Sequence, residues 1–557
     1  MQLQEVGLPE EVLRLLRGRS CVHEPVPMSV LSQPLVSMVT YDPLRVAAAA
    51  ILLTLLVQHV PRLVRTLWRG GVLRRIKMIL ARLYMKAPGM RKKLEEGEKK
   101  LKERIQGLLL KYRDQPMRSL PAKGLPSQEV LGRLKASSAR DKEVWGTGKV
   151  SGGVYHGDEE VLKLVSAAME PFLTANPLHP DLFPSVRQME AEIVQMTGEL
   201  FHADAEVKGV LTSGGTESLI MMLYAYREWG RQDRGITAAE VIAPRSAHAA
   251  LSKGAHYFGI RLIYVDVDPT SLQASVSAME AAITSNTVAL VCSVPSFPHG
   301  LIDPVQGLAE IALRAKVNLH VDCGLGGYLV PFMAEAGYPM PRFDFLLPGV
   351  SSISCDPHKY GCTPKGISVL LYRSAQLRSY QYFMEMEWSG GLYFTPCFAG
   401  SRNGAISAGA WAALTHYGRE GYIQNTKAII AAVRHIRERS SELPDLQILG
   451  DPLTSVIAFT SSTLNPHAVA DTMRAEFQWA LISLQSPPAF HLCVTIANAH
   501  KSNEFISNLK AAISLVKGLA DPSKSDTAAI YGLAESVPDK TYLRSVGESY
   551  LDCLFMA

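Results

Sequence analysis

Short apolar runs alternate with longer helix-like runs between residues 207 and 322, and this alternation constrains the fold most strongly. The apolar runs contain many β-branched residues; they are "VKGVLT", "EVIAP", "RLIYVDVD", "TVALVCSV" and "VNLHVD". Residues 216–229 and the run "VQGLAEIALRAK" have helical character and lie among them. A repeated strand–helix–strand order is typical of a mainly parallel sheet with helices on both faces. The pattern therefore predicts an α/β domain.

Two further runs, "VSSISCD" and "GISVLLYR", are expected to be strands, which places Lys359 of "SCDPHKYGCTPKG" on their connection. Beyond residue 402, helix-like runs ("AISAGAWAALTHYG", "NTKAIIAAVRHIRERSSEL") are followed by strand-like ones ("LTSVIAFT", "HLCVTIAN"). A chain of 557 residues is longer than one compact core usually supports. We therefore predict a large domain at 144–400 and a smaller α+β domain at 401–557.

An apolar run at 46–57 precedes a strongly basic segment near the N-terminus. The run is shorter than the ~20 apolar residues that span a bilayer comfortably, although the apolar residues before it extend it. A buried helix rich in alanine and leucine is the alternative; we favour a single transmembrane helix at 41–61. A basic neck and helical segment follows at 62–143, with 18 Lys/Arg against 5 Asp/Glu between residues 62 and 118. The positive-inside rule places this neck in the cytosol and residues 1–40 on the opposite, lumenal side.

The composition is that of a globular protein, with 47% hydrophobic and 20% charged residues. The net charge is +5, and residues 62–118 alone carry +13, so the remainder carries about −8. We expect no nucleic-acid partner for this mildly acidic body. Eight cysteines form no CxxC pair and no metal-ligand spacing, which favours reduced thiols and predicts no metal site.

Four features in chain order could carry chemistry. "LTSGGTES", from Leu211 to Ser218, places two glycines between a strand and a helix, where backbone amides suit a phosphate, although such glycines also simply form turns. His248 is a lone histidine, and Asp322 ends an expected strand, where open α/β sheets bind ligands but where an aspartate also caps turns. Lys359 is the fourth. Taken together, they match the needs of pyridoxal 5'-phosphate: a phosphate cradle, a ring partner, a carboxylate for the pyridine nitrogen and a lysine for the aldehyde.

The lysine segment "SCDPHKYG" resembles that of the group II pyridoxal-phosphate decarboxylase-like family. Longer segments resemble the branch of this family that cleaves phosphorylated long-chain bases, and they run from about residue 144 to the end. Among them are "SGGVYHGDEE", "NPLHPDLFPSVRQMEAEIV", "APRSAHAALSKGAHYFG", "VCSVPSFPHGLIDPV" and "AGSRNGAISAGAWAAL". The resemblance implies a fold-type I transferase-like large domain. It also implies a homodimer with shared active sites, held in the endoplasmic reticulum membrane with its catalytic part in the cytosol.

The resemblance also assigns roles residue by residue. It implies that Lys359 carries the cofactor as a Schiff base, that His248 stacks on its ring and that Asp322 meets its pyridine nitrogen. Residues that hold the cofactor phosphate would be Ser213, Gly214, Gly215, Thr216 and His358, with Ser401 reaching it from the second protomer. Residues that line the entry and bind the substrate phosphate would be Tyr155, Asn176, His179 and Lys365. Without the resemblance, Lys365 would be an exposed turn lysine, and Tyr155 and His179 would have packing roles.

Two departures from the family pattern, at Cys323–Gly324 and at Cys362, lie beside the predicted catalytic positions. The reaction implied is retro-aldol cleavage of the C2–C3 bond of a phosphorylated long-chain base, which yields a long-chain aldehyde and phosphoethanolamine. The nearest alternative is an amino-acid decarboxylase on the same fold, which would need a cation, typically arginine, for the substrate carboxylate. A membrane-tethered scaffold without catalysis is a further alternative, which the presence of all the expected catalytic residues disfavours.

Overall fold

A computed structural model describes residues 117–519 and 541–556 and, with gaps, residues 95–107. The predicted lumenal segment at 1–40, the predicted transmembrane helix at 41–61 and most of the neck up to residue 116 lie outside the described residues. Within the part of the chain that is described, no helix has the length and apolar character needed to cross a membrane.

The chain divides into two compact units, residues 1–118 with 535–557, and residues 119–534. In the first unit, helix α18 spans Thr541–Cys553. Helical residues between 95 and 107 carry the i,i+4 ion pairs Lys99–Glu103 and Lys102–Glu98, as expected for a solvated helix in the neck. The second unit contains both sheets that are described below.

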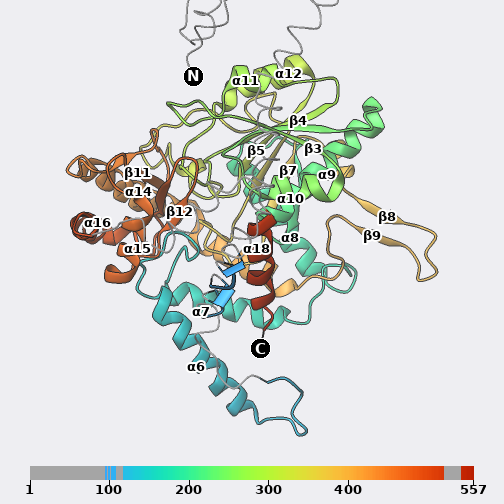
Figure 1. Cartoon of the computed structure of the whole chain (residues 1–557). Coiled ribbons are helices and arrows are strands. Elements are labelled where there is room, and N and C mark those ends of the chain that lie inside the picture. The colour runs from blue at the N-terminus through green and yellow to red at the C-terminus, as the bar shows by residue number, and fades with distance from the viewer. Residues whose placement is uncertain are drawn as a thin grey trace, which may run out of the picture. The chain divides into compact units, whose positions relative to one another are not determined.

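A seven-stranded sheet organises the large unit (Figure 1). Its strands are β1 (Lys208–Thr212), β2 (Glu240–Pro244), β3 (Arg261–Val265), β4 (Thr287–Ser293), β5 (Asn318–Cys323), β6 (Ser352–Cys355) and β7 (Ser368–Tyr372). They lie in the order β1-β7-β6-β5-β4-β2-β3, and only β7 runs antiparallel to its neighbours. The carboxyl ends of the other six strands therefore meet at one edge. This confirms the predicted mainly parallel α/β fold.

The apolar character of the central strands reflects their position between two layers of helices. Every residue of β2 and of β4 is buried, as expected for parallel strands that are covered on both faces. Helices of this part are α9 (Gly215–Arg234), α10 (Ala250–Phe258), α11 (Val276–Ala281), α12 (Val305–Ala315) and α13 (Ala375–Ser379). Helix α9 packs against β4, β5, β6 and β7, and it therefore covers the side chains that these strands present on one face of the sheet.

A smaller four-stranded antiparallel sheet follows, in the order β10-β11-β13-β12. Its strands are β10 (Gln447–Ile448), β11 (Val456–Thr460), β12 (Ile482–Leu484) and β13 (Ala489–Cys493), and its helices are α14 (Gly404–Ser440), α15 (Pro466–Phe477) and α16 (Ser502–Lys517). The two helices expected after residue 402 join into α14, which has a kink at Gly418 (φ +54°). Glycine allows this left-handed conformation, so the chain turns without a loop.

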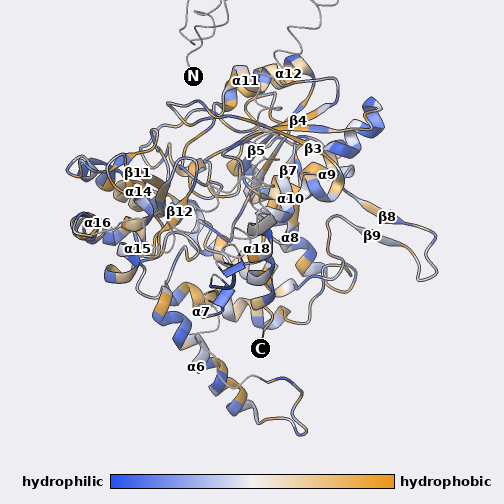
Figure 2. Ribbon diagram, in the orientation of Figure 1, coloured by the Kyte–Doolittle hydropathy of each residue, from blue (hydrophilic) through white to orange (hydrophobic). Residues whose placement is uncertain are grey.

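Within the second unit, three α-helices precede the large sheet in the chain: α6 (Ser127–Trp145), α7 (Glu159–Met169) and α8 (Pro184–Leu200). A hairpin of β8 (Phe383–Glu385) and β9 (Tyr393–Thr395) projects from the large sheet's side of the unit (Figure 1). Figure 2 shows hydrophobic residues along this hairpin. Its exposed apolar side chains are Phe383, Met384, Met386, Trp388, Leu392 and Phe394.

Candidate active site

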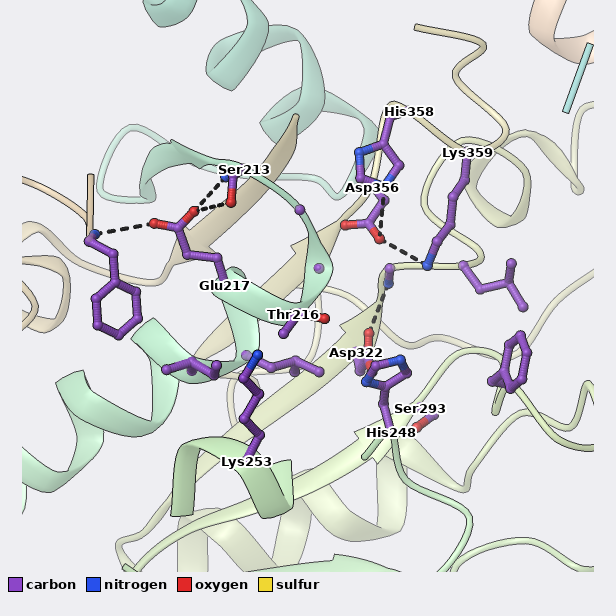
Figure 3. Close-up of a pocket in the computed structure, with 18 of the residues that line it drawn as sticks. Ser213, Thr216, Glu217, His248, Lys253, Ser293, Asp322, Asp356, His358 and Lys359 are labelled. Carbon is purple, nitrogen blue, oxygen red and sulfur yellow. Dashed lines mark hydrogen bonds and ion pairs between the residues drawn. The ribbon is translucent and has the colours of Figure 1, made fainter. Parts of the chain in front are cut away.

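A cavity of about 830 Å³ lies at the carboxyl edge of the large sheet. Ser293 at the end of β4 and Asp322 near the end of β5 line it, and so do the residues that directly follow β1 and β6. Open α/β sheets place ligands at this edge because strand ends and helix N-termini converge there. Nine of the predicted site residues line this one cavity: Tyr155, Ser213, Gly214, Gly215, Thr216, His248, Asp322, His358 and Lys359. Figure 3 shows this cavity with many of these side chains.

The loop between β1 and α9 forms a cradle of backbone. Helix α9 starts at Gly215, and no side chain caps Gly214, which precedes it. The first amides of an α-helix have no partner within the helix and attract anions. A Cβ atom at Gly215 would lie 2.6 Å from Oδ2 of Asp356, so a larger residue here would displace either the loop or this carboxylate. Glu217 braces the loop from the first turn of α9, because its carboxylate accepts hydrogen bonds from the amide of Ser213 (2.7 Å) and from its hydroxyl (2.5 Å).

Lys359 lies in the turn after β6 and forms an ion pair with Asp356. Its Nζ atom is 2.9 Å from Oδ2 of that carboxylate, and the Asp356 side chain is 1% exposed (Figure 3). Burial lowers the pKa of the lysine amine, but Asp356 outweighs this effect, so the pKa of Lys359 stays above its ordinary value. The other oxygen of Asp356, Oδ1, is buried and has no hydrogen-bond partner among the described residues. The lysine is thus held as a cation beside an incompletely satisfied carboxylate.

Asp322 and His248 face the same cavity from two different strand ends. Oδ1 of Asp322 accepts hydrogen bonds from the amide of Gly324 (2.9 Å) and the hydroxyl of Ser354 (3.3 Å). Nδ1 of His248 accepts a hydrogen bond from the amide of Ala250 (3.1 Å), which fixes the position of its ring at the start of α10. A Cβ atom at Gly324 would lie 3.1 Å from Oδ1 of Asp322. The departure at Cys323–Gly324 therefore leaves room for this carboxylate.

A second cavity of about 340 Å³ adjoins the first and is mostly apolar. Tyr155, His358 and Lys359 line both cavities. Lys365 lines the second cavity, where its Nζ atom lies 4.7 Å from the centre of the Tyr155 ring and donates a hydrogen bond to the carbonyl of His358 (2.8 Å). Partial burial and the nearby charge of Lys359 lower the pKa of Lys365. Cys362, the second departure, is buried in the lining of this cavity.

Three predicted residues lie apart from both cavities. Nδ2 of Asn176 donates a hydrogen bond to the hydroxyl of Ser401 (3.0 Å), and Oδ1 of Asn176 accepts one from the amide of Arg402 (3.1 Å). Ser401 is exposed, and so is His179, which follows Asn176 by three residues. None of the three is among the residues that line the two cavities within this chain.

Several cavity residues were not predicted from the sequence. Asp356, Glu217, Ser293, Lys253 and Tyr257 all line the larger cavity. Asp356 could have been predicted from the sequence, because a carboxylate three positions before a lysine in a tight turn can reach the lysine amine. Ser293 and Tyr257 had none, since only the arrangement of β4 and α10 brings them to the cavity.

Comparison with known proteins agrees with this geometry. The pyridoxal-dependent decarboxylase conserved domain matches residues 164–462. Sphingosine-1-phosphate lyase 1 of Mus musculus is 40% identical over 523 residues, which cover 92% of this chain and 90% of that protein. Sphingosine-1-phosphate lyase of Saccharomyces cerevisiae is 41% identical over 484 residues, which cover 86% of this chain and 82% of that protein.

Solved structures show the same architecture. A sphingosine-1-phosphate lyase of Burkholderia pseudomallei matches with a TM-score of 0.73 and 37% sequence identity, and the match covers 79% of this chain and 98% of that one. Glutamate decarboxylase of Lactobacillus brevis matches with a TM-score of 0.63 and 19% identity over 75% of this chain and 99% of that one, which supports the fold alone.

The sheet, the phosphate-type cradle and the half-buried lysine define a fold-type I pyridoxal-phosphate enzyme. The chain belongs to the pyridoxal-dependent decarboxylase family, among relatives that are sphingosine-1-phosphate lyases. This confirms the resemblance that the motifs indicated.

The residues of the larger cavity fit pyridoxal phosphate. Its volume accommodates a cofactor of this size together with a substrate headgroup. The cradle at Gly214–Gly215 has the uncapped helix amides that a phosphate requires, and Lys359 supplies the amine. The unpartnered Oδ1 of Asp356 marks a buried polar site that the protein alone leaves incomplete.

Proposed function

We propose that this chain is a sphingosine-1-phosphate lyase, which cleaves the C2–C3 bond of phosphorylated long-chain bases into a long-chain aldehyde and phosphoethanolamine. The observation that carries the proposal is the half-buried Lys359 amine, at the junction of a large cavity with a second cavity that contains Lys365. The high identity to lyases over most of their length supports the same reaction.

Bound pyridoxal phosphate supplies an electron sink for the electron pair that the broken C2–C3 bond leaves behind. Lys359 would hold the cofactor through its amine. Asp322 would keep the pyridine nitrogen protonated, and His248 would pack on the ring. The residues that would hold the cofactor phosphate are Ser213, Gly214, Gly215, Thr216 and His358.

Lys365 and Tyr155 bind the phosphate of the substrate. They adjoin Lys359, so a phosphate placed between them would be close to the carbon atoms that react. A lysine without a carboxylate partner is suited to a phosphate as a point charge, and among the described residues the Lys365 amine bonds to the carbonyl of His358 and to no carboxylate. Asn176 and His179 are assigned to the entry of the site.

The functional unit is a homodimer in which Ser401 of the partner subunit completes the phosphate site. Ser401 is exposed and lies apart from the cavities of its own chain, which suits a residue that serves a second copy. The hairpin β8–β9 lies shortly before Ser401 in the chain and exposes six large apolar side chains. Contiguous exposed apolar surface of this kind is typical of protein–protein contacts.

The enzyme is anchored in the endoplasmic reticulum membrane by a single transmembrane helix at 41–61. Residues 1–40 are lumenal, the basic neck at 62–143 is cytosolic, and the domains at 144–400 and 401–557 carry catalysis. The charge asymmetry and the apolar run support this arrangement. A bilayer-held enzyme suits a substrate whose long alkyl chain keeps it in the membrane.

An amino-acid decarboxylase is the second candidate, since decarboxylases share the fold. Such an enzyme would need a cation for the substrate carboxylate, typically arginine. Among the described residues, those that line the two cavities include no arginine. This observation favours the lyase.

The test is to incubate the purified holoenzyme with sphingosine phosphate, unphosphorylated sphingosine, glutamate and aromatic amino acids. We expect aldehyde from the phosphorylated base, far less from the unphosphorylated one, and no carbon dioxide from the amino acids. Carbon dioxide without aldehyde would overturn the lyase assignment. The Lys359→Ala variant serves as the control, and it should lose both aldehyde release and the visible absorbance band of the lysine-bound cofactor.

A further inference from the structure

Four polar side chains, none of them at the cavity surface, lie fully buried between the large sheet and α9. They are His320 on β5, Ser352 and Ser354 on β6, and Tyr226 on α9, and each is 0% exposed. Polar groups buried to this extent destabilise a core unless they are hydrogen-bonded to one another. Their arrangement at this place therefore requires a specific explanation.

The register of two parallel strands brings these side chains together with Asp322. His320 pairs with Ser352, and Asp322 pairs with Ser354. Alternate residues of a strand share one face of the sheet, so His320 and Asp322 lie on the same face. Helix α9 packs against both strands, and it contributes Tyr226.

An unbroken chain of hydrogen bonds connects these groups to Asp322. The Tyr226 hydroxyl lies 2.5 Å from Oγ of Ser352, which lies 2.7 Å from Nδ1 of His320. Nε2 of His320 lies 3.1 Å from Oγ of Ser354, and the hydroxyl of Ser354 donates to Oδ1 of Asp322 at 3.3 Å. The chain thus ends on the carboxylate assigned to the pyridine nitrogen.

The donor and the acceptor in each of these hydrogen bonds follow from the end of the hydrogen-bond chain at Asp322. An ionised carboxylate only accepts, so the single proton of Ser354 points at Asp322, and Ser354 must accept from Nε2–H of His320. Burial lowers the pKa of His320 to about 3, so its ring is neutral and carries one N–H. Nδ1 therefore accepts from Ser352.

The same reasoning fixes the far end of the chain. Because the Ser352 hydroxyl donates to His320, its oxygen accepts from the hydroxyl of Tyr226. Burial raises the pKa of Tyr226, which keeps this phenol protonated. All four donors then point toward Asp322, and hydrogen bonds aligned in this way polarise and strengthen one another.

We infer that Tyr226, Ser352, His320 and Ser354 are positioning residues that orient the Asp322 carboxylate and hold its negative charge against the cofactor's ring nitrogen. The inference rests on the proposed assignment of Asp322 to that nitrogen. The chain acts through Asp322 and touches neither substrate nor cofactor. Its chemical effect is to keep the ring nitrogen protonated, and it does so from inside the core, where water does not compete for the hydrogen bonds.

The test is a graded series at Ser354, read in the holoenzyme reconstituted with nitrogen-15-labelled pyridoxal phosphate. Ser354→Cys keeps a weak donor of similar size, and Ser354→Ala removes the donor. We expect the ring-nitrogen chemical shift to move toward that of neutral pyridine in the order Ser, Cys, Ala. We also expect the cofactor dissociation constant to rise about tenfold in Ser354→Ala, which corresponds to about 1.4 kcal/mol.

Two further variants test how far along the hydrogen-bond chain the effect on the ring nitrogen extends. His320→Leu should move the ring-nitrogen shift in the same direction as Ser354→Ala, and Tyr226→Phe should move it less. If His320→Leu does not fold, the near-isosteric Ser354 series still decides the matter. Ser368→Ala is the matched control, because this buried serine on β7 donates to the carbonyl of Cys355 and is not part of the chain. It should leave the ring-nitrogen shift at the wild-type value.

Asp322→Asn separates failure of the inference from failure of the site assignment. If Asp322→Asn moves the ring-nitrogen shift while Ser354→Ala leaves both shift and affinity unchanged, the hydrogen-bond chain has no role and the inference is wrong. If Asp322→Asn also leaves the shift unchanged, the assignment of Asp322 is wrong, and the inference falls with it. If Ser368→Ala changes the ring-nitrogen shift as much as Ser354→Ala does, the effect comes from packing of the core and not from the hydrogen-bond chain. That result would also overturn the inference.

Discussion

The amine of Lys359 lies 2.9 Å from a carboxylate oxygen of Asp356, three residues earlier in the same turn. The turn is closed by a backbone hydrogen bond from the amide of Lys359 to the carbonyl of Asp356 (3.0 Å). Without the cofactor, therefore, the amine to which we assign the cofactor is held as a cation in an ion pair. It must lose a proton before it can react, because only the neutral amine is a nucleophile.

The first prediction concerns this ion pair. In Asp356→Asn, the main interaction that opposes the effect of burial on Lys359 is lost and only the smaller effects of Asp322 and Cys493 remain, so the pKa of the amine falls. The cofactor-free variant should capture pyridoxal phosphate faster than wild type at pH 7, on the order of tenfold, and its pH–rate profile should shift to lower pH. Stopped-flow absorbance measures this rate. Asp344→Asn is the control, since this buried carboxylate pairs with His202 and not with Lys359; an equal shift there would contradict the prediction.

The second prediction concerns the cradle at Gly215. In Gly215→Ala the added Cβ would meet Oδ2 of Asp356 at 2.6 Å, so either the loop or the carboxylate must move. We expect the cofactor dissociation constant to rise by about tenfold or more. Equilibrium titration of the cofactor-free protein measures it. Gly157→Ala, where nothing lies within 4 Å of the new atom, should bind the cofactor as wild type does.

The third prediction concerns Lys365. In Lys365→Met the KM for the phosphorylated base should rise about tenfold or more, because a charge-assisted contact to the substrate phosphate is lost. Turnover of the unphosphorylated base and the absorbance of the bound cofactor should not change. Steady-state kinetics on both substrates distinguish these effects, and Lys163→Met on the surface of α7 is the control. An equal loss on both substrates would remove Lys365 from phosphate recognition.

The fourth prediction concerns the buried carboxylate of Asp303, which is 2% exposed and accepts hydrogen bonds from the amides of Ala274 and Ser293 (2.8 Å each). Burial raises the pKa of Asp303 to about 6, so the folded state binds its proton more tightly than the unfolded state does. This carboxyl stabilises the fold below its unfolded-state pKa and loses that contribution as pH rises through about 6.

Asp303→Asn removes this titration. The difference in unfolding free energy between variant and wild type should therefore change by about 3 kcal/mol in favour of the variant between pH 4 and pH 8. Urea titrations at several pH values measure this difference. A difference that does not vary with pH would show that Asp303 has an ordinary pKa in the folded protein.

The fifth prediction concerns the hairpin β8–β9. Replacing Trp388 and Leu392 with serine should weaken the proposed homodimer at least tenfold, since it removes exposed apolar side chains that a partner would bury. Sedimentation at a series of concentrations measures the dissociation constant. Leu313→Ser, which changes an exposed leucine on α12, should leave it unaffected. A double variant that remains as dimeric as wild type would place the interface elsewhere.

Much of the site could be predicted because its residues follow strand ends. Asp322 lies near the end of β5, Gly214 lies between β1 and α9, and Gly215 begins α9, so local pattern alone places them at the carboxyl edge of the sheet. The hydrogen-bond chain behind Asp322 could not be predicted in this way. Ser352 and Ser354 look like ordinary polar positions of a short strand until the register sets them opposite His320 and Asp322.

The sequence by itself determined the strand–helix order, the mainly parallel sheet, the family and the lysine, because these depend on periodicity and on motifs a few residues long. The tertiary structure alone decided which groups surround Lys359. It brought the Asp356 carboxylate, which follows β6, against Gly215 at the start of α9. It also aligned β5 with β6 so that buried donors point at Asp322. The physical reason is that hydrogen bonds and ion pairs act over about 3 Å. A contact of that length between residues far apart in the chain depends on strand register and helix packing, which no local pattern specifies.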